Sequence, residues 1–118
     1  MTLLNIASMH GHIQVIKHLV KSGAKVDKPD LQRRTPLSWA AENGHLDAVK
    51  LLVELGANIN SKDKNGGTPL AWVVCEGQGD RIDEVFDYLV SQGAKEFLQY
   101  SCLHKLRVQW LNVREKFI

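Results

Sequence analysis

The sequence contains only two cysteines, Cys75 and Cys102, and neither belongs to a CxxC pair or to a spacing typical of metal ligands. We therefore expect two reduced thiols in a cytoplasmic or nuclear protein, rather than a disulfide in a secreted one. Proline occurs just three times, while 44% of the residues are hydrophobic and 24% are charged. This mixture is typical of a globular chain and not of a disordered one.

Long apolar segments and a strong charge excess are also absent from the 118 residues, whose number suits a single domain. No apolar run approaches the roughly 20 residues that a membrane helix needs, so no membrane partner is expected. The start of the chain, MTLLNIASMHGH, lacks the basic stretch and apolar core of a secretory signal. The formal net charge of +2 is too small to indicate nucleic acid by itself.

Signatures of catalysis are missing as well. There is no glycine-rich phosphate loop that opens a helix, no GxSxG, and no nucleophile with a base nearby. The five histidines lack acidic or thiol neighbours at ligand spacing, which favours structural or solvated roles over a metal site. The sequence therefore predicts a protein that is not an enzyme, with no catalytic residue, no metal and no cofactor.

What the sequence does contain is an internal repeat with a period of 33 residues. Thr2, Thr35 and Thr68 fall at this interval, and the second and third units open with TPLSW and TPLAW. The first unit reads TLLNIASMHGHIQVIKHLVKSGAKVD and the second reads TPLSWAAENGHLDAVKLLVELGANIN. A fixed period of this length indicates a repeat architecture in which each unit covers its neighbour.

The second unit shows how each repeat is expected to fold. Thr35 is a good N-cap, and Pro36 suits the first helical position, where its missing N–H is not needed. Gly44 and Gly56 can adopt a positive φ and end the two helices. The buried faces of the two helices are predicted to comprise Leu37, Ala40, Ala41 and Gly44, and Leu46, Val49, Leu52 and Val53. The stretch ANINSKDKNGG is rich in turn residues and predicts a projecting finger.

These stretches resemble the ankyrin repeat family, whose mark is T-P-L-H-x-A followed by G-H and L-L-x-x-G-A. The matching segments are TPLSWAAENGH with LLVELGANIN, and TPLAWV with LVSQGA. The resemblance covers about residues 1–95 and implies an all-α solenoid of stacked antiparallel helix pairs with β-turn fingers. It also implies a concave surface that binds another protein, which makes a non-catalytic protein–protein interaction module the expected function. The expected repeats are residues 1–33, 34–66 and 67–97, which together form a unit over 1–97.

Residues 98–118 are expected to form a degenerate fourth unit that serves as a C-terminal capping helix. SCLHKL resembles the start of a repeat, and an apolar stripe at helical spacing follows it. The other face of this helix carries Lys105, Arg107, Arg114 and Lys116. Contact of this basic face with nucleic acid is an alternative function, although protein binding is favoured. A further alternative is a targeting module that belongs to a larger enzyme.

Candidate binding residues on the helices are found at the family's variable recognition positions. The resemblance assigns these positions to Glu42, Asn43, Cys75 and Glu76. Trp39 and Trp72 share faces with them at helical spacing and form a ladder with Ile6. Two interpretations of the indoles remain open, namely packing against their neighbours and direct contact with a partner.

The fingers supply the remaining candidates. The matching recognition positions are Leu31, Gln32 and Arg34 in one finger, with Arg33 as a further candidate, and Lys62, Lys64, Asn65 and Gly67 in the next. Arg33 stands where the family typically has glycine. The basic side chains are consistent with a partner that carries an acidic patch, and solvated loop charge is the alternative. The identity of that partner and the oligomeric state do not follow from the sequence.

Three departures from the family pattern carry expectations of their own. The apolar face of Leu4 and Ala7 has no preceding repeat to cover it, which suggests a longer array or a different cap. The family histidine is replaced by Asn5, Ser38 and Ala71, which is expected to loosen the stack by about 1 kcal/mol per lost hydrogen bond. The stretch EGQGDRIDE in the third repeat predicts a surface insertion or, alternatively, a partner contact.

Overall fold

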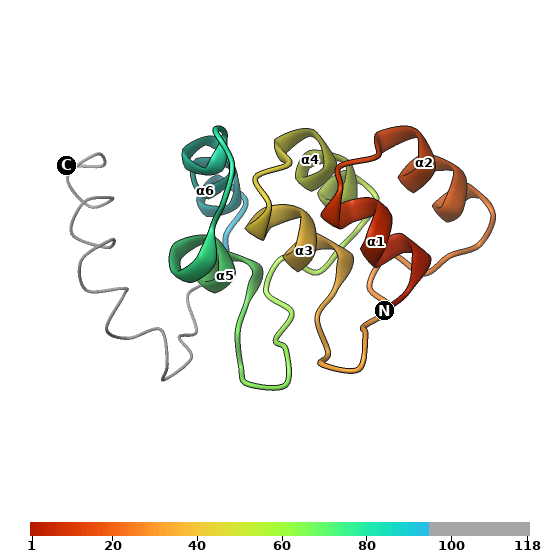
Figure 1. The fold of residues 1–118 in the computed structure, drawn as a ribbon, viewed down its shortest axis with the longest axis horizontal. Helices are drawn as coiled ribbons and strands as arrows, with labels where there is room; N and C mark the ends of the chain where they lie inside the picture. Colours follow the sequence, from red (N-terminus) through yellow and green to blue (C-terminus); the bar gives the residue numbers. More distant parts are fainter. Residues whose placement is uncertain (95–118) are drawn as a thin grey trace.

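The computed structural model describes residues 1–94, and within this range the chain forms six α-helices and no β-strand. The helices are α1 (Leu3–Met9), α2 (Ile13–Lys21), α3 (Pro36–Glu42), α4 (Leu46–Glu54), α5 (Pro69–Glu76) and α6 (Ile82–Ser91). They form three pairs that lie side by side, with loops projecting to one side (Figure 1). The predicted all-α solenoid is confirmed, whereas the predicted capping helix over 98–118 lies outside the described residues.

The first helix of each pair (α1, α3 or α5), which we call the inner helix, begins directly after the repeated threonine, as the sequence predicts. The hydroxyls of Thr2, Thr35 and Thr68 accept hydrogen bonds from the backbone N–H three residues later, at 3.1, 3.4 and 3.2 Å. Pro36 and Pro69 occupy the first turns of α3 and α5. These caps satisfy N–H groups that the helices themselves leave unpaired, so one local signal sets the register of all three repeats.

The repeats stack through small residues. Helix α3 contacts both α1 and α5, while α4 contacts α2 and α6. Ala40 and Ala41 are fully buried between the inner helices. Gly44 has a φ of 73°, and a Cβ at this position would collide with the carbonyl oxygen of Gln78. Close approach between repeats two and three therefore requires a glycine here, as the turn itself does.

The turn of the third repeat differs from the other two. Gly77, which aligns with Gly11 and Gly44, has a φ of −56°, and the positive φ of 99° belongs instead to Gly79. The backbone N–H of Gln78 donates to the carbonyl of Glu42 at 2.8 Å. The inserted segment is thus joined to the preceding repeat at its start, while Asp80, Asp83 and Glu84 are exposed.

The structure corrects the expectation that Leu4 and Ala7 are uncovered. Both side chains are only 3% exposed, because their face of α1 turns toward the interior of the stack and not toward the open end. The large apolar residues that are exposed in the first repeat are Met1, Leu3, Ile6, Val15 and Leu31. None of the helices in residues 1–94 combines the length and apolar character needed to cross a membrane.

Two polar side chains of α1 are buried without compensation. Asn5 and Ser8 are fully buried, and their side-chain polar atoms have no hydrogen-bond partner within the described part of the chain. At the position of Asn5 in the second repeat, Ser38 receives a hydrogen bond from the Arg34 Nε at 3.1 Å. An unpaired buried polar group lowers stability, so the first repeat is the less well satisfied of the two.

Replacing Ser8 with alanine is expected to raise the free energy of unfolding by about 1 kcal/mol. The substitution removes an unpaired buried hydroxyl, and alanine has a higher helix propensity than serine. Ala41 already occupies the equivalent position of the second repeat, where it is fully buried. Urea denaturation followed by circular dichroism measures the change. A loss of stability would show that the hydroxyl has a favourable partner.

Candidate functional site

An aspartate organises each finger in the same way. We call residues 24–34 finger 1 and residues 57–67 finger 2. In finger 1 the Asp30 Oδ1 accepts the backbone N–H groups of Gln32 and Arg34, at 2.9 and 3.0 Å. In finger 2 the Asp63 Oδ1 accepts those of Asn65 and Gly67, at 2.9 and 2.8 Å. One carboxylate oxygen thus closes each turn, which is the local bonding that favours aspartate in loops.

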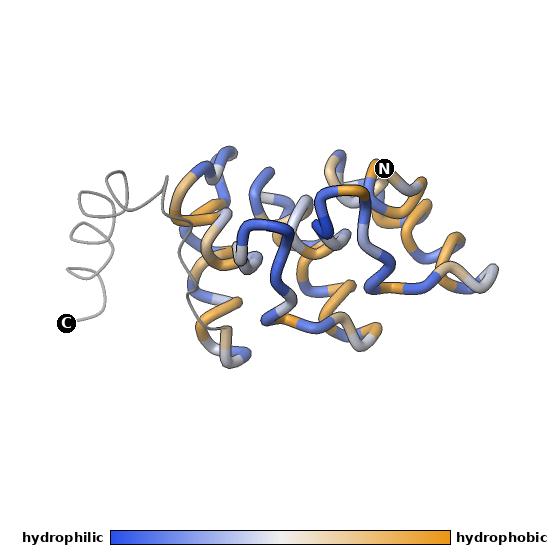
Figure 2. The backbone as a smooth tube through the Cα atoms, turned by 90° about the horizontal axis from the view of Figure 1, so that it is seen from below, coloured by the Kyte–Doolittle hydropathy of each residue, from blue (hydrophilic) through white to orange (hydrophobic). Residues whose placement is uncertain are grey.

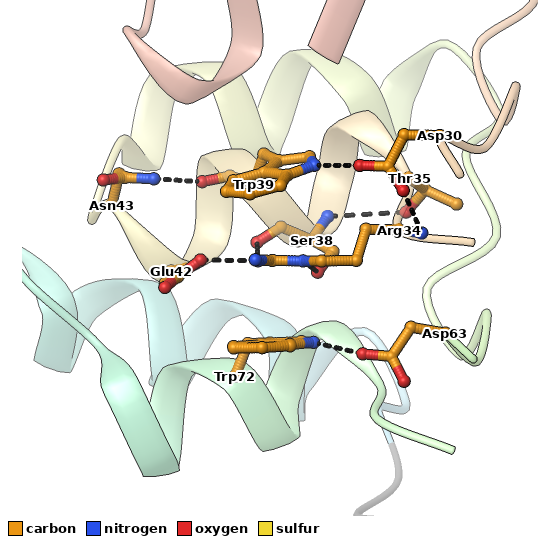
Figure 3. Close-up of polar contacts among 9 residues, drawn as sticks. All are labelled: Asp30, Arg34, Thr35, Ser38, Trp39, Glu42, Asn43, Asp63 and Trp72. Carbon is orange, nitrogen blue, oxygen red and sulfur yellow. Dashed lines mark hydrogen bonds and ion pairs between the residues drawn. The ribbon is translucent and has the colours of Figure 1, made fainter. Parts of the chain in front are cut away.

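The second oxygen of each carboxylate holds a tryptophan. The Trp39 Nε1 donates to the Asp30 Oδ2 at 3.0 Å, and the Trp72 Nε1 donates to the Asp63 Oδ2 at 2.7 Å. Each indole comes nine residues after its aspartate, on the helix that follows the finger (Figure 3). Each of the two fingers is therefore joined to the helix that follows it by a half-buried polar contact.

Arg34 fills the space between the two indoles. Its guanidinium carbon lies 3.6 Å from the ring centroid of Trp39 and 3.8 Å from that of Trp72. Figure 3 shows the planar group parallel to both rings, with one ring on each side. We call Trp39, Arg34 and Trp72 the clamp. A guanidinium stacks well on aromatic faces because it is flat, delocalised and weakly hydrated, so the clamp ties the third repeat to the second.

Acceptors lie along one edge of the guanidinium. Its Nη2 donates to the Glu42 Oε2 at 2.5 Å, and its Nε donates to the Ser38 Oγ at 3.1 Å. The side chains of Arg34 and Glu42 are only 4% and 14% exposed. Burial lowers the pKa of Arg34, while the bonded Glu42 and the charges of Asp63 and Asp30 act to raise the pKa. An arginine stays protonated under such conditions, so the clamp contains a permanent buried cation.

The tips of the two fingers form one continuous surface. The backbone N–H of Lys64 donates to the carbonyl of Gln32 at 2.8 Å and joins the tips directly. Leu31 is 93% exposed, and Arg33 and Lys62 are exposed as well. Most residues of the finger loops are hydrophilic (Figure 2). Because Asp30 and Asp63 turn inward to the indoles, the charged side chains that face solvent at the tips, Arg33, Lys62 and Lys64, are basic.

The candidate residues predicted from the sequence separate into three groups. The exposed group contains Leu31, Gln32, Arg33, Lys62, Lys64, Asn65 and Glu76. The half-buried group, which lines the inner helices, contains Trp39, Glu42, Asn43 and Trp72. The third group is buried and contains Arg34 and Cys75, at 3% and 4% exposure.

The buried group requires a correction. Arg34 does not offer its charge at the fingertip, because its side chain turns inward and pairs with Glu42. Cys75 does not lie on the surface beside Trp72, because its side chain is only 4% exposed and packs in the hydrophobic core. Of the two interpretations of the tryptophans, the structure shows the packing contacts, with Arg34 as the neighbour that both indoles share.

Sequence reasoning missed Asp30 and Asp63, which position both the fingers and the indoles. A signal for them was present, because Asp and Trp recur together at the 33-residue period with the same spacing of nine. It also missed the role of Ser38 as an acceptor for Arg34. That role depends on which of the two adjacent arginines turns inward, and the repeat pattern of the sequence does not indicate which one does.

Arg33 is the one non-glycine residue with a positive φ among the described residues, at 61°. Gly66 holds the same place in finger 2, with a φ of 83°. Replacing Arg33 with glycine is expected to raise the free energy of unfolding by about 0.5 kcal/mol, because glycine adopts this conformation without strain but loses more entropy on folding. Thermal denaturation of the variant beside the parent protein checks this, and a clear drop in melting temperature would contradict it.

The stacked helix pairs, the threonine caps, the glycine turns and the fingers define a helical repeat protein. Comparison with known families agrees. The model for ankyrin repeats in three copies matches residues 4–100, and the chain belongs to this family. A comparison with curated proteins gave no significant match. Within residues 1–94, no group of three or more histidine, cysteine, aspartate or glutamate side chains is arranged to hold a metal ion.

Proposed function

We propose that this chain binds a protein partner through the joined fingertips and the adjoining surface of the inner helices, and that it performs no catalysis. It carries three ankyrin repeats, which are in general protein–protein interaction modules. The observation that carries the proposal is the division of charge in the fingers. Their two organising carboxylates are used internally, while Leu31 and the basic side chains face solvent.

The partner that best fits this surface has an acidic patch next to an apolar socket. Leu31 is a large apolar side chain that is almost wholly exposed, and such a residue is a natural anchor for a hydrophobic contact. Around it, Arg33, Lys62 and Lys64 are exposed. Rim charges of one sign steer an oppositely charged partner and speed association more than they add affinity. Binding should therefore weaken as the salt concentration rises.

The half-buried residues of the inner helices have a supporting part in this proposal. Trp39 and Trp72 are fixed by their aspartates and by Arg34, so their exposed edges form a rigid wall beside the fingertips. Asn43 is also held in place, because its Nδ2 donates to the Trp39 carbonyl at 2.8 Å. A partner meets a preformed surface here, which reduces the entropy lost on binding.

A comparative capture experiment tests the proposal. The immobilised chain is used as bait beside a fingertip variant, Leu31→Ser with Lys62→Glu and Lys64→Glu. A matched control replaces one apolar residue and two lysines on α2 by Ser, Glu and Glu, at the exposed positions Val15, Lys17 and Lys21. We expect proteins captured by the parent chain to be reduced at least tenfold with the fingertip variant and retained by the control.

The outcome is read by quantitative mass spectrometry, with circular dichroism to show that all three baits are folded. Equal losses with both variants would indicate a nonspecific effect of charge. Full retention by the fingertip variant would place the binding surface elsewhere and contradict the proposal.

A further inference from the structure

Both walls of the space between Trp39 and Trp72 are held by contacts other than those to Arg34. The Trp39 indole is held by Asp30 at 3.0 Å, and the Trp72 indole is held by Asp63 at 2.7 Å. Each tryptophan also belongs to a different inner helix, and these helices pack on each other through the core. Figure 3 shows the two rings facing each other on either side of the planar guanidinium. Because neither ring depends on Arg34 alone for its position, we expect this arrangement to persist when the Arg34 side chain is removed.

The walls of this slot have the chemistry of a receptor for a flat cation. Two aromatic faces lie 3.6 and 3.8 Å from the guanidinium carbon. In the plane of the group, Glu42 accepts at 2.5 Å, and the hydroxyl and carbonyl of Ser38 accept at 3.1 and 3.4 Å. This arrangement matches the forked donors of a guanidinium and not the compact, strongly hydrated charge of an ammonium.

We propose that the slot between Trp39 and Trp72 is a guanidinium-binding site, which Arg34 fills from within the chain and thereby latches finger 1 to the second and third repeats. The same site accepts a guanidinium from outside when the Arg34 side chain is removed. Finger 2 has no equivalent latch, because Gly67 stands one period after Arg34. The slot contains none of the fingertip residues Leu31, Lys62 and Lys64, so a cation can bind there whether or not the fingertips bind a partner.

The test uses the variant Arg34→Gly, which copies the residue found at this position in finger 2. Methylguanidinium is titrated up to about 20 mM, and methylammonium at equal ionic strength is the control. We expect a saturable rise of about 5 °C in the melting temperature of the variant with methylguanidinium, as for a ligand that binds the folded state alone. The parent protein should show no rise, and methylammonium should give none with either protein.

A second measurement distinguishes binding of a cation in the slot from attachment of finger 1 to the repeats. Hydrogen exchange is measured at the amides of residues 30–34. With methylguanidinium bound to Arg34→Gly, these amides should stay faster than in the parent, because the small cation is not attached to finger 1.

Several outcomes would overturn the inference. They are an equal thermal response of parent and variant, an equal response to both cations, and no response of a folded variant. If Arg34→Gly is unfolded at 25 °C, methylguanidinium must restore its helical ellipticity, and failure to do so would equally contradict the site. Adding Trp72→Leu to the variant removes one aromatic wall and should abolish the response if the slot is where the cation binds.

Discussion

Replacing Arg34 with alanine is expected to lower the free energy of unfolding by about 3 kcal/mol, the cost typical of removing one partner from a buried ion pair. The change leaves Glu42, whose side chain is only 14% exposed, with its charge uncompensated. It also removes the packing that two indoles share. Urea denaturation followed by circular dichroism provides the measurement.

The neighbouring arginine provides the matched control. Arg33→Ala removes the same charge from the same finger, but the side chain is exposed and takes no part in the clamp. We expect this variant to change stability by less than about 0.5 kcal/mol. A loss below 1 kcal/mol for Arg34→Ala, or equal losses for the two variants, would show that the clamp contributes little.

The double variant Trp39→Ala with Trp72→Ala is expected to lose about 4 to 5 kcal/mol, which is most of the stability of a domain of this size. Each indole is half-buried, so each truncation costs less than that of a fully buried tryptophan. Together the two substitutions also remove both aromatic rings that stack on the buried guanidinium of Arg34. Loss of the helical circular dichroism signal near room temperature is the expected result.

Phenylalanine at both positions serves as the control for this prediction. It keeps an aromatic face on each side of Arg34 but loses the N–H groups that bind Asp30 and Asp63. We expect a folded protein that is less stable by about 2 kcal/mol, or 1 kcal/mol per lost hydrogen bond. If the double alanine variant instead keeps its full stability, the indoles do not hold the repeats together, and direct contact with a partner becomes their main role.

Most of the fold was predictable because its signals are local and recur at a fixed period. Thr35 and Pro36 fix the start of a helix through one cap and one dihedral angle. Gly44 fixes the end of that helix through a positive φ, and the alanines of α3 indicate the close approach of its neighbours. Each of these signals depends on a few adjacent residues, so sequence spacing alone specifies it.

The site was less predictable because it depends on which way side chains turn at the junction of three elements. Arg33 and Arg34 are adjacent and chemically identical, yet one is exposed with a positive φ and the other is buried between helices. The difference arises because the backbone of finger 1 is closed by Asp30, which aims the following residues in opposite directions. Cys75 shows the same limit, since a recognition position of the family here faces the core.

The central claim is that Arg34 and the two indoles act as one unit, and a double-mutant cycle between Arg34→Ala and Trp72→Ala tests it most directly. The residues lie in direct contact, with the guanidinium carbon 3.8 Å from the ring centroid. We predict that the double variant is more stable than the sum of the single losses implies, by a coupling energy of about 1.5 kcal/mol in urea unfolding. Additive losses, with a coupling energy near zero, would contradict the clamp.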